Sequence, residues 1–89
     1  MLIGCPKEIK NHEYRVGLTP ESARELARHG HEVWIQSGAG LGIDATDDEY
    51  RAAGAKIVDG PDEIFAKCEM VVKVKEPQAG ERSKLREGQ

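Results

Sequence analysis

The chain has 89 residues, which is the size of one small domain. Its 13 Lys and Arg against 16 Asp and Glu give a net charge of -3 and a pI near 5.6. The basic residues form no long block, and this distribution argues against a nucleic-acid partner. No segment approaches the roughly 18 apolar residues of a membrane span. Pro6 and nearby charges also interrupt any signal-peptide core. We therefore expect a cytoplasmic domain with neither nucleic acid nor membrane as a partner.

The first third of the chain predicts a strand, a loop and a helix. The apolar segment Met1–Cys5 is typical of a short strand, and Pro6 ends it because proline cannot donate to a strand ladder. Thr19 is a suitable N-cap and Pro20 occupies the favoured first helical position. The apolar residues that follow have helical spacing, and Gly30 ends the predicted helix.

The middle of the chain predicts two further strands joined by a turn and a helix. Glu32–Gln36 contains three adjacent apolar residues, which is typical of a strand covered on both faces. The glycine-rich turn Gly38–Gly42 follows. Thr46–Glu49 is a capping box that begins a helix ending at Gly54, and Lys56–Val58 is the third predicted strand.

The last third predicts a helix after Pro61 and a fourth strand over Glu69–Val74. Strands that alternate with helices through short connections form parallel crossovers. We therefore predict an α/β fold, a doubly wound parallel sheet of about four strands, Rossmann-like or flavodoxin-like, with strand order 3-2-1-4. In this order, the carboxyl ends of strands 1 and 4 lie side by side, where ligands usually bind. Gln78–Lys84 is interpreted as the start of another crossover, so we expect the sheet to be incomplete at its carboxyl end.

Several residues that invite a chemical interpretation are better explained structurally. Cys5 and Cys68 lack the spacing of a zinc or redox motif and are predicted to be buried free thiols. The Gly38–Gly42 turn lacks the G-x-G-x-x-G spacing and follows the second strand, so we interpret it as a structural turn. The three histidines form no ligand-like cluster. The residues alone therefore predict neither a metal site nor a cofactor site in this chain.

Two cationic segments are the strongest functional signal. Lys73 and Lys75 lie at the end of the fourth predicted strand, and Arg15 lies in a loop that could face the same crevice. The guanidinium of arginine can grip both oxygens of a carboxylate, which a lysine cannot do. Convergence of these cations indicates a small carboxylate ligand, although each cation could instead be a solvated surface residue. The two lysines would point to the same face unless the strand ends and turns between them.

Other polar residues of the same loops are candidates for supporting roles. Glu8 and Glu13 could orient Arg15 through ion pairs, and His12 is close enough in sequence to line the pocket. Tyr14 could pack over the site. We treat Glu8, His12, Glu13 and Lys73 as candidate neighbours of the ligand-binding residues.

Four segments together resemble the alanine dehydrogenase/pyridine nucleotide transhydrogenase family, and specifically the amino-terminal part of alanine dehydrogenases. They are Met1–Pro20, the stretch from His29 to Gly40, Ala52–Ala55 and Val72–Gln78. The resemblance implies an NAD-dependent oxidoreductase that interconverts L-alanine and pyruvate. It also implies that Arg15 and Lys75 bind the substrate and that Lys75 is the catalytic residue of this segment. In the transhydrogenase alpha subunit the position of Lys75 is usually not lysine, so Lys75 favours the dehydrogenase.

The resemblance also sets expectations for the parent protein. Residues 1–89 are expected to be the amino-terminal part of the substrate domain, with the NAD-binding domain outside this chain. The isolated chain is therefore expected to be inactive. The parent is expected to form a homo-oligomer, and the isolated chain to pair through the exposed edge of its last strand. The alternatives are the amino-terminal part of a transhydrogenase alpha subunit and a non-catalytic ligand-binding or scaffold module of the same fold.

Overall fold

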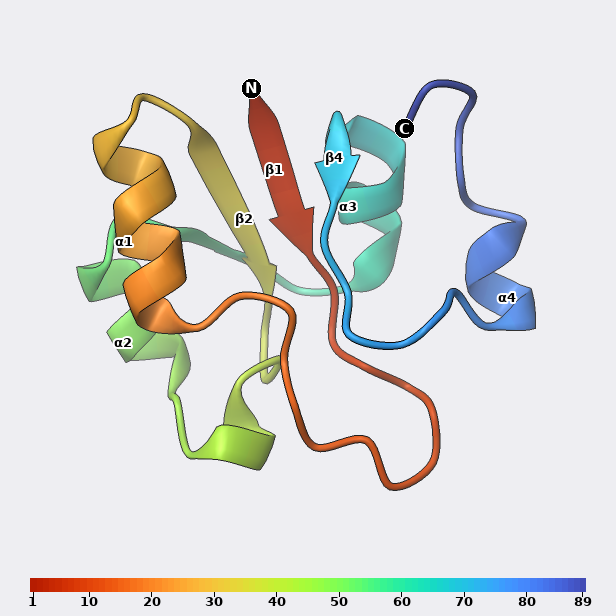
Figure 1. Ribbon diagram of the computed structural model, residues 1–89, viewed down its shortest axis with the longest axis horizontal. Helices are drawn as coiled ribbons and strands as arrows, with labels where there is room; N and C mark the ends of the chain where they lie inside the picture. Colours follow the sequence, from red (N-terminus) through yellow and green to blue (C-terminus); the bar gives the residue numbers. More distant parts are fainter.

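The computed structural model describes all residues 1–89 and contains one four-stranded parallel sheet (Figure 1). The strand order is β3-β2-β1-β4, and every neighbouring pair is parallel. The α/β fold class and the strand order are therefore confirmed. The strands are β1 (Leu2–Cys5), β2 (Glu32–Gln36), β3 (Lys56–Val58) and β4 (Met70–Val71). The helices are α1 (Pro20–Arg28), α2 (Asp47–Ala52), α3 (Pro61–Lys67), α4 (Ala79–Arg82) and the 3-10 helix η1 (Leu41–Ile43).

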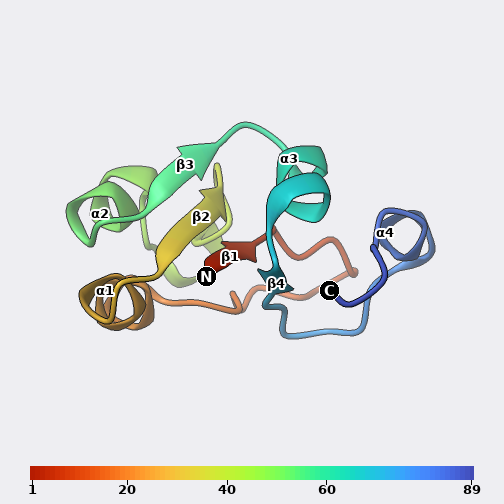
Figure 2. The same ribbon diagram turned by 90° about the horizontal axis from the view of Figure 1, so that it is seen from above.

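Helices cover both faces of the sheet (Figure 2). Alternate strand residues point to opposite faces, so Ile3 and Ile35 belong to a core cluster on the side of α1 and α2 that includes Tyr50. Trp34 belongs to a second cluster on the side of α3, where it lies with Ile64. The adjacent apolar residues of β2 are thus needed on both faces.

The helix starts follow the capping signals of the sequence. The Thr19 hydroxyl accepts a hydrogen bond from the Ser22 amide at 3.2 Å and begins α1. At the start of α2, both reciprocal bonds of the Thr46–Glu49 capping box are present. Such caps satisfy amide groups that have no partner within the first helical turn.

β4 is shorter than the predicted strand Glu69–Val74: only Met70 and Val71 pair with β1 as a strand. The amide of Val72 still donates to the Gly4 carbonyl at 2.9 Å. Beyond this bond β1 offers no further pairing, because it ends at Cys5. The amides of Val74 and Lys75 donate to the Glu8 carboxylate instead. The loss of a backbone partner therefore ends β4 and starts an irregular loop over residues 72–78.

The loop after β1 passes close to this second loop at Gly17. A Cβ atom added to Gly17 would lie 2.7 Å from the Val72 carbonyl oxygen, so only glycine allows the two backbones to approach this closely. This contact brings residues 6–18 beside residues 72–78. Among the helices, none is long and apolar enough to cross a membrane.

Candidate carboxylate-binding site

The candidate site lies at the carboxyl ends of β1 and β4, where the loops that follow these strands meet (Figure 1). The chain after β1 continues to α1 on one face of the sheet, whereas α3, which precedes β4, covers the other face. Open α/β sheets bind ligands at such a switch point. The two loops carry the residues that the sequence singled out.

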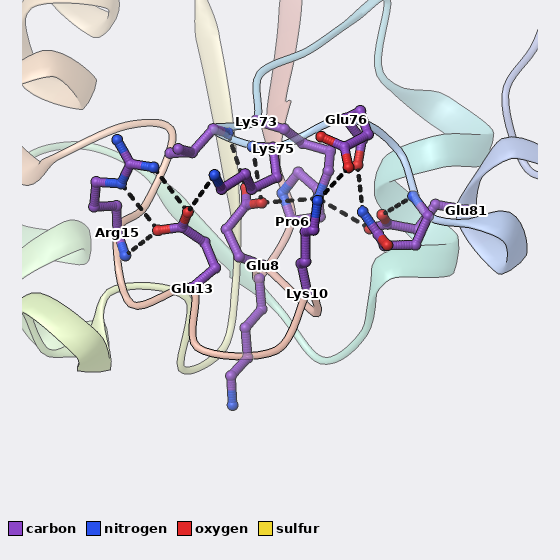
Figure 3. Close-up of polar contacts among 12 residues, drawn as sticks. Pro6, Glu8, Lys10, Glu13, Arg15, Lys73, Lys75, Glu76 and Glu81 are labelled. Atoms are coloured by element: carbon purple, nitrogen blue, oxygen red, sulfur yellow. Dashed lines mark hydrogen bonds and ion pairs between the residues drawn. The ribbon is translucent and has the colours of Figure 1, made fainter.

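Arg15 and Lys75 lie on either side of the Glu13 carboxylate (Figure 3). The Arg15 side chain forms a two-pronged ion pair with Glu13, with Nε–Oε2 at 3.0 Å and Nη2–Oε1 at 2.9 Å. The Nζ atom of Lys75 lies 3.8 Å from Oε1 of the same carboxylate. The Glu13 side chain is 4% exposed, whereas Arg15 and Lys75 are 66% and 39% exposed. The structure therefore brings both predicted cations together and leaves both accessible.

Electrostatics at this cluster keep Glu13 ionised. Hydrogen bonds from the Arg15 side chain and backbone lower the pKa of Glu13 from 4.5 to about 2, and the charge of Lys75 acts in the same direction. The same ion pair raises the pKa of Arg15. A permanent negative charge thus lies between the two cations at neutral pH.

Lys73 has a different role from Lys75. Its Nζ atom lies 3.3 Å from Glu8 Oε1 and 3.1 Å from Glu81 Oε2, and all three side chains are buried. This buried network joins the loop after β1, the loop after β4 and helix α4 (Figure 3). Lys73 therefore does not face a ligand, and Glu8 pairs with Lys73 rather than with Arg15.

The Glu8 carboxylate also fixes the backbone that carries Lys75. Its oxygens accept hydrogen bonds from the Val74 amide at 3.0 Å and the Lys75 amide at 3.3 Å. Glu81 acts in the same way on the far side of the loop, where its carboxylate accepts from the Gln78 amide at 2.9 Å. Loop residues 73–78 are thus held at both ends by buried carboxylates.

A pocket of about 350 Å³ opens beside Glu13 and Arg15. One wall belongs to the turn after β2, which the sequence indicated only as structural. Gly42 in this wall packs so tightly on the Tyr14 carbonyl that a Cβ atom would overlap it. The closely spaced glycines of the turn are the sequence signal that could have indicated a close backbone approach, but they do not show that the neighbouring residue is Tyr14. The lining residues are Lys7, Glu8, Glu13, Tyr14, Arg15, Gly38, Ala39, Leu41 and Gly42.

Asp47, the first residue of α2, holds this turn in place. Its carboxylate accepts hydrogen bonds from the Ser37 hydroxyl at 2.6 Å and the Gly38 amide at 2.9 Å. These bonds lower the pKa of Asp47. The wall of the pocket is therefore fixed by a residue that the sequence indicated only as part of a helix cap.

His12 and Tyr14 lie at the outer side of the site. The His12 Nδ1 atom is 3.4 Å from the Tyr14 hydroxyl, and both residues are exposed. Tyr14 lines the pocket, whereas His12 does not. Nearby, Lys10 and Glu76 form an ion pair at 2.6 Å that joins the two loops once more.

The structure groups no three His, Cys, Asp or Glu side chains in a manner that could hold a metal ion. Cys5 and Cys68 are free and buried. Burial raises the pKa of each thiol to about 11. Because the thiolate is the reactive form, these cysteines serve packing rather than chemistry.

The fold and the site together define a parallel α/β domain with a charged pocket, lined by Arg15 and Glu13 and neighboured by Lys75, at the carboxyl edge of its sheet. Comparison with known proteins gives the particular family. Residues 4–89 match the family described as alanine dehydrogenase/PNT, N-terminal domain, and the chain belongs to this family.

Relatives from distant organisms agree with this assignment. The chain is 52% identical over all 89 residues to an alanine dehydrogenase of Mycolicibacterium smegmatis and 52% identical to one of Methanococcus maripaludis. It covers 24% of the length of each. Among solved structures, an L-alanine dehydrogenase superposes with a TM-score of 0.93 at 48% identity, over 97% of this chain and 24% of the other. A transhydrogenase from Sinorhizobium meliloti superposes with a TM-score of 0.91 at 33% identity, over 99% of this chain and 25% of the other.

Proposed function

We propose that this chain is the amino-terminal part of the substrate domain of an NAD-dependent alanine dehydrogenase. The observation that supports this most is the pair Arg15 and Lys75, which flank one carboxylate beside a pocket at the switch point of the sheet. About half of the residues are shared with alanine dehydrogenases. The proposed reaction converts L-alanine, NAD and water into pyruvate, ammonia and NADH in the parent protein.

In this proposal Arg15 binds the substrate carboxylate. Its Nε and Nη2 atoms bind Glu13, which leaves Nη1 and one hydrogen of Nη2 available to a second carboxylate. The ion pair with Glu13 restricts the rotation of the guanidinium before the ligand arrives. Such preorganisation reduces the entropic cost of binding.

Lys75 is the proposed catalytic residue. Its ammonium group is accessible and is positioned by Glu8 through the backbone. It can donate a hydrogen bond to the carboxylate or carbonyl oxygen of pyruvate, and during alanine oxidation it can stabilise the oxygen as the carbonyl forms. NAD would be held by residues in the remainder of the parent, and when bound it would supply the hydride-accepting chemistry.

The chain spans about a quarter of the length of its relatives, so the activity is proposed for the parent only. The parent is proposed to be a cytoplasmic homo-oligomer. The isolated 89-residue chain is expected to form no NADH from alanine, because the proposed NAD site belongs to the remainder of the parent.

The transhydrogenase alpha subunit is the second candidate, because a transhydrogenase shares the fold at 33% identity. One assay separates the candidates. The full-length parent, purified and supplied with alanine and NAD, is expected to form NADH and pyruvate, and Lys75→Met is expected to abolish this activity. Lys84→Met is the matched control, since Lys84 pairs with Asp62 away from the pocket. Hydride exchange between nicotinamide nucleotides without alanine turnover would favour the transhydrogenase, and absence of both activities would favour a non-catalytic module.

A further inference from the structure

Glu13 is the one acidic side chain that contacts both proposed ligand-binding cations. Its carboxylate binds Arg15 at 2.9 and 3.0 Å and lies 3.8 Å from the Lys75 ammonium. The backbone amide of Arg15 also donates to it at 2.9 Å. Because the Glu13 side chain is almost fully buried, it is held in the site rather than displaced into solvent.

Neither cation is saturated by Glu13. The Nη1 atom of Arg15 has no hydrogen-bond partner within the protein. The 3.8 Å separation at Lys75 is longer than a direct hydrogen bond, so its donors are also available. Each cation therefore keeps donors for a ligand carboxylate while Glu13 remains in place between them (Figure 3).

The three side chains form a cluster with a defined net charge. Two cations and one carboxylate leave a single positive charge, which one ligand carboxylate neutralises. Lys73 adds no further attraction for anions, because its ammonium is buried between the Glu8 and Glu81 carboxylates. Lys7 is the remaining cation of the pocket lining; its ammonium lies beside Gly38 and forms no ion pair with Glu13. A second ligand carboxylate beside Glu13 would therefore approach a fixed negative charge, and like charges at short distance repel.

We propose that Glu13 makes this pocket selective for monocarboxylates over dicarboxylates. This specificity role rests on the proposed function of the pocket as a 2-oxo acid site. It differs from the orienting role of Glu13 toward Arg15, because an orienting role alone would change the affinity for both ligand classes equally. The ratio of the two affinities is therefore the informative quantity.

The test compares two 2-oxo acids of equal chain length, 2-oxobutyrate with one carboxylate and freshly prepared oxaloacetate with two. Dissociation constants are measured by calorimetry on the full-length protein and on Glu13→Gln. We expect wild type to bind 2-oxobutyrate more tightly, and Glu13→Gln to shift the affinity ratio toward oxaloacetate by at least about fivefold. Glu25→Gln is the matched control, since Glu25 also pairs with an arginine and lies in α1 away from the pocket.

The conservative variant Glu13→Asp separates the effect of the negative charge from a purely structural effect of the substitution. It keeps the negative charge, so it is expected to keep the preference for 2-oxobutyrate even if both affinities fall. An unchanged ratio in Glu13→Gln, or a wild-type protein that binds oxaloacetate as tightly as 2-oxobutyrate, would overturn the proposal. A wild-type protein that binds neither these acids nor pyruvate would instead reject the proposed function of the pocket.

Discussion

Two lysines that are only two residues apart have opposite environments. Lys73 is 7% exposed and lies between two buried carboxylates, whereas Lys75 is 39% exposed and faces Glu13. On a continuous strand they would share a face. They separate because β4 ends at Val71, before either lysine is reached. The different partners of the two side chains therefore follow from where the strand ends.

Gly42 is the residue that fits the turn wall against the loop of Arg15. We predict that Gly42→Ala destabilises the protein by roughly 1 to 3 kcal/mol, because the added methyl group overlaps the Tyr14 carbonyl. Urea denaturation would measure the change in free energy of unfolding. Gly60→Ala is the control, since nothing lies within 4 Å of a Cβ atom at that position. Equal stability of the two variants would show that the turn can move away from Tyr14.

The loop over residues 72–78 is positioned by buried charges rather than by secondary structure. Glu8 from the loop after β1 and Glu81 from α4 both bind Lys73. The same two carboxylates accept backbone amides at the two ends of the loop. The position of Lys75 thus depends on Glu8, which lies far from it in sequence, as well as on the nearby Glu81.

The Lys73→Met variant tests this network. Removing the cation leaves two carboxylates buried together without a counter-charge, and breaking a buried ion pair in this way costs about 3 to 5 kcal/mol. Denaturant unfolding would measure the loss. Lys84→Met is the control, because the Lys84–Asp62 pair is exposed and such pairs contribute about 1 kcal/mol or less. A loss of stability in Lys73→Met no larger than in Lys84→Met would contradict the role of the network.

Local signals explain why much of the fold was predictable. The caps at Thr19 and Thr46 and the apolar core of β2 each act within a few residues of the chain. The end of β4 was not predictable in this way, because it depends on where the partner strand β1 ends, more than 60 residues earlier in the chain, and the amides of Val74 and Lys75 then bind Glu8. For the same reason the sequence grouped Arg15 with Lys75 but did not identify the Gly38–Gly42 turn as a wall of the pocket.

Two ion pairs involving loop glutamates make the stability of the protein depend on acid pH. Arg15 lowers the pKa of Glu13 to about 2, and Lys10 lowers that of Glu76 to about 2, both from 4.5. A lowered folded-state pKa means that the stabilisation is complete above the unfolded value and is lost as pH falls toward the folded value. We therefore predict declining stability between about pH 4.5 and pH 2.

Urea midpoints measured from neutral pH down to about pH 2 would check this window. The double variant Glu13→Gln with Glu76→Gln is expected to flatten the decline, because neither position can then take up a proton. Glu25→Gln serves as a control, since Glu25 is exposed on α1 and lies outside both loops. A double variant that loses stability as steeply as wild type would place the acid-sensitive groups elsewhere.

We propose that Arg15 anchors a ligand carboxylate beside Lys75, and a pyruvate titration of the full-length protein measures this anchoring role. Charge-assisted hydrogen bonds contribute about 1.5 to 3 kcal/mol each, so Arg15→Ala is expected to weaken pyruvate binding by roughly tenfold to a hundredfold. Arg15→Lys should not restore it, because lysine lacks the planar fork. Arg28→Ala, an exposed arginine of α1, should bind like wild type. Saturable pyruvate binding that both Arg15→Ala and Arg15→Lys weaken would support the anchoring role of Arg15. Arg15→Lys binding pyruvate within about twofold of wild type would contradict it.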